Sequence, residues 1–89
     1  MDARSALLSV LGRLGFERSA LQDATQLQDE LDVDSTELVE VAIAVEKELG
    51  VSIDTASFVA LRTFGELVGY VEKAPPNEPR EATNAANPA

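Results

Sequence analysis

Residues 34–50 read Asp-Ser-Thr-Glu-Leu-Val-Glu-Val-Ala-Ile-Ala-Val-Glu-Lys-Glu-Leu-Gly, and this stretch predicts one amphipathic helix. Asp34 and Glu37 have the spacing of a capping box, which satisfies backbone N–H groups at the start of a helix. Gly50 suits the left-handed conformation in which many helices end. With about 100° between successive residues, an apolar stripe faces inward: Leu38, Val41, Ala42, Val45 and Leu49. The opposite side faces solvent and carries Thr36, Glu40, Ile43 and Lys47.

The chain before this helix divides into a second helical segment and a long connection. Residues 3–14 place apolar side chains at helical spacing, and Gly15 follows as the residue that ends the helix. Residues 16–33 carry leucines only at irregular intervals among polar side chains. We therefore expect a long, partly packed loop there. It is longer than the usual connection between helices, which is itself a hint of function.

Two shorter helices follow after an extended link. Asp54 is placed to cap a brief helix that includes Phe58 and Leu61. Thr63 and Glu66 form a second capping box. The last helix begins there and ends just before two successive prolines, because proline cannot continue it.

The length and composition allow one small domain. A chain of 89 residues supports a single core, and its 45% hydrophobic but only 4% aromatic residues favour aliphatic packing between helices. We predict an all-α fold: a small antiparallel bundle of four helices, three main and one short, with a long loop between the first two. The domain covers residues 1–73. Residues 74–89 have no periodic apolar face and are predicted to form a disordered tail.

The charge is strongly negative and unevenly placed. The formal net charge is -9, and residues 19–54 hold ten acidic residues and a single base, Lys47. The phosphate backbone of a nucleic acid would be repelled, so we expect no nucleic-acid partner. Basic protein surfaces are the natural complement of such a segment.

The inventory of reactive side chains is short. The chain has no Cys and no His, which removes thiol nucleophiles, imidazole bases and the usual zinc ligands. We therefore predict no metal site, no catalytic residue and no enzymatic activity, and any thiol must come from a cofactor. No run of about eighteen apolar residues occurs, so we expect no membrane contact and an unexported, cytoplasmic protein.

Ser35 is the residue at which chemistry is best placed. A hydroxyl in the first turn of a helix lies beside free backbone N–H groups and the positive end of the helix dipole. If a phosphodiester formed on that oxygen, its anion would lie against these donors despite the surrounding carboxylates. The alternative is that Ser35 only helps to start the helix, since serine is common at that position.

Three separated segments resemble the acyl carrier protein family, in the family's order. Residues 31–40 read Leu-Asp-Val-Asp-Ser-Thr-Glu-Leu-Val-Glu, and residues 45–53 read Val-Glu-Lys-Glu-Leu-Gly-Val-Ser-Ile. Residues 63–71, Thr-Phe-Gly-Glu-Leu-Val-Gly-Tyr-Val, look like that family's last helix. With the first helix and the long loop, the resemblance covers about residues 3–73.

The resemblance implies an antiparallel helical bundle that works as a carrier and not as an enzyme. Ser35 would receive 4′-phosphopantetheine from coenzyme A through a separate phosphopantetheinyl transferase, with Asp34 beside it. The terminal thiol of this arm would hold an acyl or aminoacyl group as a thioester and present it to acyltransferases, ligases or synthases. We expect a freestanding monomer. Apolar cargo would be sheltered between the second and third helices, among Val41, Val45, Phe58 and Leu61.

In this family the acidic second helix is the surface that partner enzymes read. The resemblance therefore implies a set of contacts for basic docking patches: Thr36, Glu37, Glu40, Ile43 and Glu48. Ile43 would be the apolar anchor among the acids. Thr36 stands where the family typically has leucine, and Lys47 interrupts the acidic row. These two departures favour a dedicated route, such as polyketide or other specialised biosynthesis, over generic fatty acid biosynthesis.

Other interpretations remain open at this stage. An unmodified acidic helical interaction module would bind a basic partner and use Ser35 only as structure. A calcium loop is suggested by the acids around Ser35, but Glu37 and Ile43 occupy the positions at which such a loop needs glycine and glutamate. A hydrolase would lack the histidine that activates a serine nucleophile.

Overall fold

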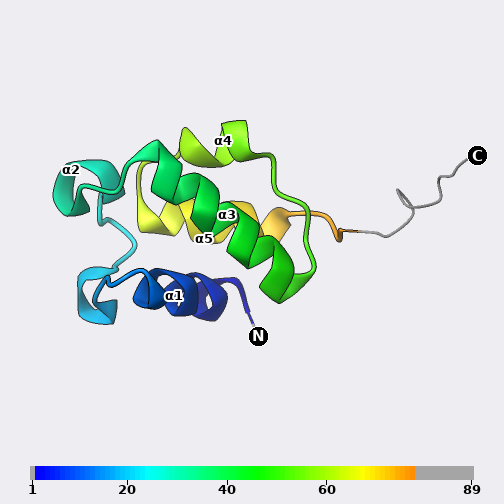
Figure 1. Ribbon diagram of the computed structural model, residues 1–89, viewed down its shortest axis with the longest axis horizontal. Helices are drawn as coiled ribbons and strands as arrows, with labels where there is room; N and C mark the ends of the chain where they lie inside the picture. The colour runs from blue at the N-terminus through cyan, green and yellow to red at the C-terminus, as the bar shows by residue number, and fades with distance from the viewer. Residues whose placement is uncertain (1, 78–89) are drawn as a thin grey trace, which may run out of the picture.

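Three long helices make the body of the molecule in the computed structural model, which describes residues 2–77 (Figure 1). They are α1 (Ala3–Arg13), α3 (Ser35–Leu49) and α5 (Phe64–Lys73). Short elements join them: the 3-10 turn η1 (Arg18–Ala20), α2 (Leu27–Leu31) and α4 (Thr55–Val59). The predicted all-α class, with three main helices and a short α4, is confirmed. Within this part of the chain, no helix is both long and apolar enough to cross a membrane.

Helix α3 begins and ends where the sequence predicts. Asp34 is its N-cap and accepts a hydrogen bond from the N–H of Glu37 at 2.9 Å. Glu37 Oε1 accepts in return from the N–H of Asp34 at 3.4 Å, which completes the capping box. Gly50 ends the helix with φ at 66°, a conformation that side chains with a Cβ disfavour.

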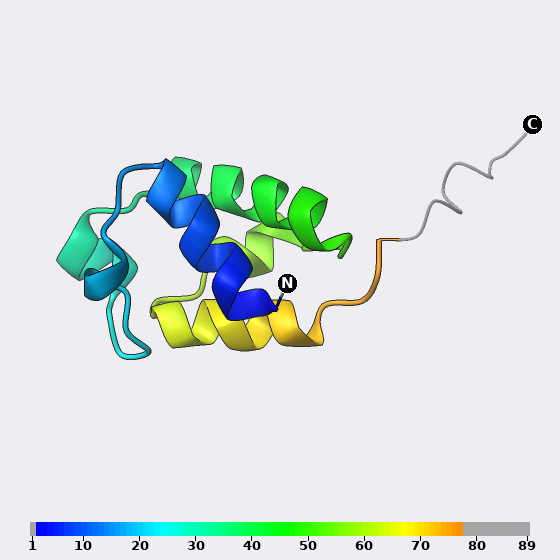
Figure 2. The same ribbon diagram turned by 90° about the horizontal axis from the view of Figure 1, so that it is seen from below.

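Helix α1 crosses both other long helices and runs opposite to them, whereas α3 and α5 run in the same general direction (Figures 1 and 2). Asp2 caps α1 by accepting from the N–H of Ser5 at 2.8 Å, and this hydrogen bond lowers the pKa of the Asp2 carboxyl. The helix ends at Arg13, and Gly15 follows with φ at 101°, close to the predicted end.

The core lies where the inward faces of the three long helices meet. Every residue predicted for the inward stripe of α3 is buried except Leu49, which is half-buried. The other two helices contribute aliphatic side chains and one phenylalanine: Ala3, Ala6, Leu7, Val10 and Leu11 from α1, and Phe64, Leu67, Val68 and Val71 from α5. Phe58 of α4 is fully buried, and its ring meets that of Tyr70 edge to face at 5.9 Å.

The predicted long, partly packed loop over residues 16–33 is not a loop throughout, because η1 and α2 lie within it. Leu27 is fully buried, and its N–H donates to the carbonyl of Arg62 at 3.0 Å. Its own carbonyl accepts from the N–H of Val33, after Asp32 has turned the chain through a left-handed φ of 58°. A five-residue helix has too few turns for its periodicity to stand out, and tertiary contacts stabilise it instead.

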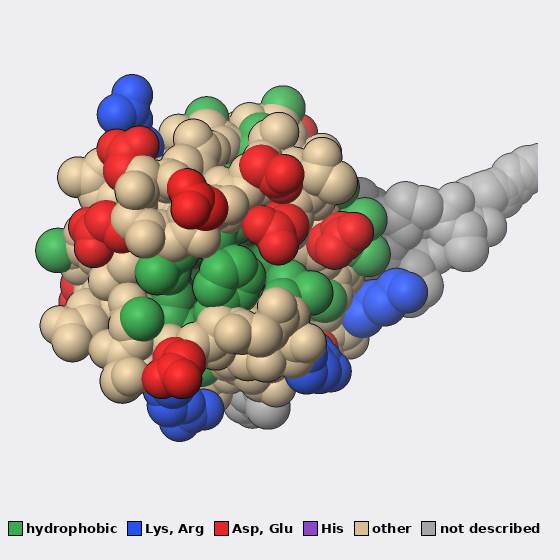
Figure 3. All heavy atoms as spheres, turned by 60° about the vertical axis from the view of Figure 1, so that its left-hand side comes forward, with side chains coloured by type: hydrophobic (Ala, Val, Ile, Leu, Met, Phe, Trp, Pro, Cys, Tyr) green, Lys and Arg blue, Asp and Glu red, His purple; other side chains and the backbone are tan. Residues whose placement is uncertain are grey.

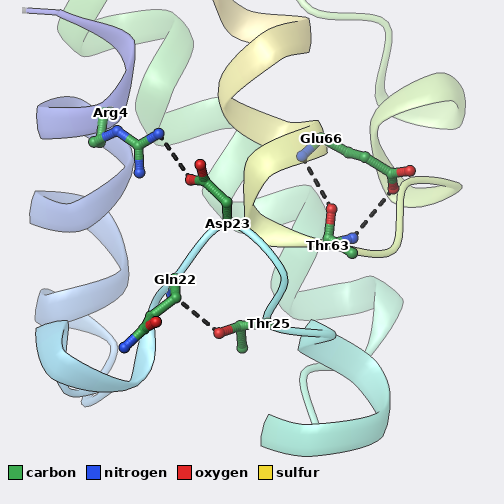
Figure 4. Close-up of polar contacts among 6 residues, drawn as sticks. All are labelled: Arg4, Gln22, Asp23, Thr25, Thr63 and Glu66. Atoms are coloured by element: carbon green, nitrogen blue, oxygen red, sulfur yellow. Dashed lines mark hydrogen bonds and ion pairs between the residues drawn. The ribbon is translucent and has the colours of Figure 1, made fainter.

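The segment before α2 is fastened to the start of α5 (Figure 4). The buried hydroxyl of Thr25 accepts from the N–H of Gln22 at 3.0 Å and donates to a backbone carbonyl of η1 at 2.9 Å. The N–H of Gly65 donates to the carbonyl of Asp23 at 3.0 Å. A Cβ at position 65 would lie only 2.9 Å from that carbonyl oxygen, so this close approach requires glycine.

Helix α5 begins at the second predicted capping box (Figure 4). The N–H of Glu66 donates to Thr63 Oγ1 at 3.1 Å. Glu66 Oε1 accepts from the N–H groups of Arg62 at 2.7 Å and Thr63 at 3.2 Å. These backbone hydrogen bonds hold the pKa of the Glu66 carboxyl below its usual 4.5. The hydrogen bond from Arg62 has the largest effect.

Helix α4 is shorter than predicted and is capped differently. It ends at Val59 and so does not reach Leu61. Asp54 holds the N-cap position, but its carboxylate accepts no backbone hydrogen bond there. It accepts from the Ser57 hydroxyl at 2.7 Å, which takes the place of the predicted cap.

The chain that follows α5 returns to the end of α3. The N–H of Ser52 donates to the carbonyl of Pro75 at 2.9 Å, and the N–H of Asn77 donates to that of Gly50 at 2.8 Å. We call residues 74–77 the strap. The predicted boundary after residue 73 stays a prediction, and residues 78–89 of the predicted tail lie outside the described residues.

Candidate functional site

Ser35 is the first residue of α3, and it is exposed to solvent. The chain reaches it through Asp34, whose backbone is extended with φ at -92° and ψ at 176°. The abrupt change from extended to helical backbone leaves Ser35 at the open end of the helix. That end carries the positive pole of the helix dipole, which favours an anion.

The backbone N–H groups at this end are only partly used by the capping box. Asp34 and Glu37 exchange hydrogen bonds, so their two N–H groups have acceptors. The N–H groups of Ser35 and Thr36 have no acceptor among residues 2–77. Two donors therefore remain for an anionic group attached at the Ser35 oxygen.

A shallow groove opens at Ser35, and we call it the Ser35 groove. Its lining consists of Gln28, Asp32, Val33, Asp34 and Ser35. Two aspartates thus line the groove with Ser35, together with one residue from α2. Sequence reasoning misses Gln28 because it places that residue in a loop. Leu27 and Leu31, four positions apart with acids between them, fit a helix, but one such pair is too short a pattern to predict α2 from the sequence.

The residues predicted to contact partners do not share one environment. Thr36, Glu40 and Ile43 are exposed on the outer side of α3, and Ile43 keeps 44% of its surface accessible. Glu37 is half-buried and engaged in the capping box. Glu48 forms an ion pair with Arg13 of α1 at 2.6 Å. The structure therefore leaves three of the five side chains open and ties the other two to the protein itself.

An apolar groove between α1 and α3 adjoins the outer side of α3, and sequence reasoning missed this groove. Val10 and Leu14 line it from α1 and the turn that follows, and Ala44 lines it from α3. Charged side chains complete the lining: Arg13, Glu40, Lys47 and Glu48. Leu14 is 38% exposed, which is unusual for a large aliphatic residue in this chain. Figure 3 shows hydrophobic side chains gathered in a hollow of the surface, with acidic side chains along its upper border.

The interior between α3 and α4 is filled by side chains. Val41, Val45 and Phe58 are fully buried, and Leu61 is half-buried. These are the residues that the sequence nominates as a shelter for apolar cargo. In this structure they are part of the core, so a cargo chain would have to displace them.

Comparison with known proteins matches residues 4–71 to the family model of the phosphopantetheine attachment site. The meromycolate extension acyl carrier protein of Mycobacterium tuberculosis is 35% identical over 68 residues, which are 76% of this chain and 59% of that protein. This chain thus spans about three fifths of that relative's length.

Two further relatives are named simply acyl carrier proteins. That of Thermotoga maritima is 36% identical over 61 residues, covering 68% of this chain and 75% of the relative. That of Rhodococcus erythropolis is 37% identical over 71 residues, covering 80% of this chain and 77% of the relative.

The family model describes the domain at which 4′-phosphopantetheine is attached covalently, and acyl carrier proteins are carriers rather than enzymes. The matched range covers α3 completely and nearly all of α1 and α5, and it contains the exposed serine at the start of α3. The resemblance predicted from separated sequence segments is confirmed. The chain belongs to the acyl carrier protein family.

Proposed function

We propose that this chain carries an acyl or aminoacyl group as a thioester on a 4′-phosphopantetheine arm bound to the Ser35 hydroxyl. The observation that supports this most strongly is the exposed Ser35 at the first position of a capped helix, within the attachment domain. The chain contains no cysteine, so the arm would supply the only thiol. Thioester chemistry then depends on the arm alone.

Attachment is the work of a separate transferase that uses coenzyme A. The Ser35 oxygen forms a bond to the phosphorus of the arm, and the pyrophosphate bond of coenzyme A breaks to release adenosine 3′,5′-bisphosphate. The hydroxyl proton leaves with the transferase's base. In the product, the phosphodiester anion lies beside the N–H groups of Ser35 and Thr36, which have no acceptor within residues 2–77, and the neighbouring Asp34 keeps the helix start in place.

Partner enzymes dock on the outer side of α3. Glu40 offers an exposed carboxylate to basic patches, and Ile43 offers an exposed apolar contact beside it. Long-range attraction between an acidic helix and a basic patch speeds encounter, whereas salt screening limits affinity. Such docking lets a monomeric carrier visit a transferase, a ligase and a synthase in turn.

We place the carrier in the cytoplasm, in a dedicated biosynthetic route such as polyketide or other specialised metabolism. Thr36 and Lys47 support this, because both lie on the exposed side of α3 that partners would read. The mycobacterial relatives are named for meromycolate extension, while other relatives carry only the general name.

The competing function is an unmodified interaction module. The apolar groove between α1 and α3 supports it, since Leu14 and Ala44 could receive an apolar side chain of a protein partner. Under this alternative Ser35 has no chemical role. The two proposals differ in whether Ser35 accepts an arm.

Intact-protein mass spectrometry separates the two. Incubation with coenzyme A and a broad-specificity phosphopantetheinyl transferase should add the mass of one arm to the wild type. Ser35→Ala should receive none, whereas the matched control Ser57→Ala, on another exposed serine, should be modified like the wild type. A folded wild type that gains no mass with several competent transferases would refute the carrier proposal.

A further inference from the structure

A polar trough leads away from Ser35 along α2. The Ser35 groove adjoins a second groove, lined by Gln26, Gln28 and Asp29 on one side and by residues 59–62 on the other. Gln28 lines both grooves, so they lie next to each other at this residue. We call the two together the α2 trough; it begins at the Ser35 hydroxyl and ends beside Arg62.

The two walls of the α2 trough are fixed to each other. The N–H of Leu27 donates to the carbonyl of Arg62 at 3.0 Å, and the N–H of Phe64 donates to the carbonyl of Thr25 at 3.0 Å. A backbone bridge between Gln26 and Thr63 continues this attachment. Figure 1 shows α2 beside the link from α4 to α5, next to the start of α3. The two walls of the trough are therefore held together by the protein's own backbone.

The lining suits the middle of a pantetheine chain. That chain contains two secondary amides, each with one N–H donor and one carbonyl acceptor. Gln26 and Gln28 carry carboxamides that can both donate and accept, and both residues are exposed at the surface. Near the far end, Val59 and Leu61 are half-buried and offer apolar contact beside the guanidinium of Arg62. The interior between α3 and α4, by contrast, is filled by buried side chains.

We infer that the phosphopantetheine arm rests in the α2 trough, with its amides bonded to Gln28 and Gln26 and its thiol end beside residues 59–62. This inference rests on the proposed attachment at Ser35. It assigns α2 a function: the helix holds the arm against the protein between visits to partner enzymes. An arm that rests on this side leaves the exposed side of α3 free for docking.

The absence of cysteine makes the arm's position measurable, because a thiol-reactive nitroxide label attaches only to the arm. The holo-protein is prepared with coenzyme A and a transferase, its mass is checked, and the label is added. Paramagnetic broadening of backbone amide signals in ¹⁵N-labelled protein should then be strongest at residues 28–29 and 60–62. Broadening centred on residues 10–14 and 44–48, or confined to residues 34–37, would overturn the inference.

Variants test the role of the carboxamides. Gln28→Ala should lower the broadening at residues 60–62 towards the level of remote amides, while residues 34–37 stay broadened. Gln22→Ala, an exposed glutamine that lines neither groove, should leave the pattern unchanged. An unlabelled arm should also shift the side-chain amide signals of Gln28 between apo- and holo-protein.

The two proposals fail in different ways. If no arm is added, the mass measurement refutes the carrier function itself. If the arm is added in full but the broadening at residues 60–62 is absent, or is unaffected by Gln28→Ala, only the resting place is wrong.

Discussion

At the scale of single residues, Thr25 holds the connection between α1 and α2 through its buried hydroxyl. Replacement by valine keeps the side-chain shape but leaves the N–H of Gln22 and the carbonyl of Ala20 without their partner. We predict that Thr25→Val lowers the free energy of unfolding by about 1–3 kcal/mol. Urea denaturation followed by circular dichroism measures this. Thr36→Val, at an exposed position, is the matched control, and equal losses in both variants would contradict the role of the buried hydroxyl.

Glu66 makes the stability of the folded protein depend on pH through its hydrogen bonds at the start of α5. Its carboxylate accepts backbone hydrogen bonds from Arg62 and Thr63, so its pKa in the folded protein lies below the 4.5 of the unfolded chain. A group with a lowered folded pKa stabilises the protein fully above its unfolded pKa, and this contribution is lost as pH falls through the folded pKa.

Denaturation midpoints over a pH series test this coupling. The wild type should lose stability more steeply than Glu66→Gln as the pH falls below 4.5, because the variant has no carboxylate to protonate at this position. Glu72→Gln, whose carboxylate accepts no hydrogen bond within residues 2–77, should follow the wild type. Parallel curves for the wild type and Glu66→Gln would show that the capping carboxylate is not linked to folding.

The candidate site shows what residue patterns can and cannot reveal. Asp34 and Ser35 are readable from sequence, because a capping box fixes where the helix begins and hence where the serine stands. Gln28 is not readable, because its place beside Ser35 depends on how Leu27 docks against Arg62, a residue far along the chain. Contacts between distant segments leave no periodic trace in the sequence.

At the scale of elements, α3 has one side for stability and another for recognition. Val45 is fully buried, and Val45→Ala should lower the free energy of unfolding by roughly 1–4 kcal/mol through lost burial. Ile43 is exposed, so Ile43→Asp should leave the melting temperature nearly unchanged but slow arm attachment and acyl transfer by partner enzymes. Thermal melts and loading assays on the same samples compare the two. Wild-type transfer rates in Ile43→Asp with every cognate enzyme would show that partners do not use this side of α3.

The long helices were predictable because each carries its own signals. α3 and α5 have capping boxes, α1 and α3 are followed by glycines with positive φ, and all three have apolar stripes that face the core. η1 and α2 have three and five residues, and neither has a side-chain cap. Their stability comes from the rest of the fold, so local propensity and periodicity could not identify them.

At the scale of the whole molecule, the strap connects the end of α5 to the end of α3. Its two backbone hydrogen bonds attach residues 75 and 77 to Ser52 and Gly50 at the end of α3. A chain that stops after Asn77 should keep these bonds, whereas one that stops after Lys73 should lose them and about 1–3 kcal/mol of the free energy of unfolding. Denaturation curves of the two truncated proteins, measured under the same conditions, give this difference in the free energy of unfolding. Equal stability would support the domain boundary after residue 73 that the sequence predicts.

The charge of the whole chain acts on partners rather than on the fold. Its excess of carboxylates is concentrated between residues 19 and 54, the segment that contains the Ser35 groove and the outer side of α3. Composition alone indicated basic partners, and the structure adds which acids remain open to them. Glu40 is exposed, while Glu48 is paired with Arg13 and Glu37 closes the capping box.

The most direct test of the account is the chemical state of residue 35 in protein purified from its own cells. Proteolysis and tandem mass spectrometry should find a phosphopantetheine arm on the peptide that contains Ser35, with or without an acyl group, and on no other peptide. Full recovery of that peptide with a bare serine, from folded protein in cells that express a competent transferase, would contradict the central claim.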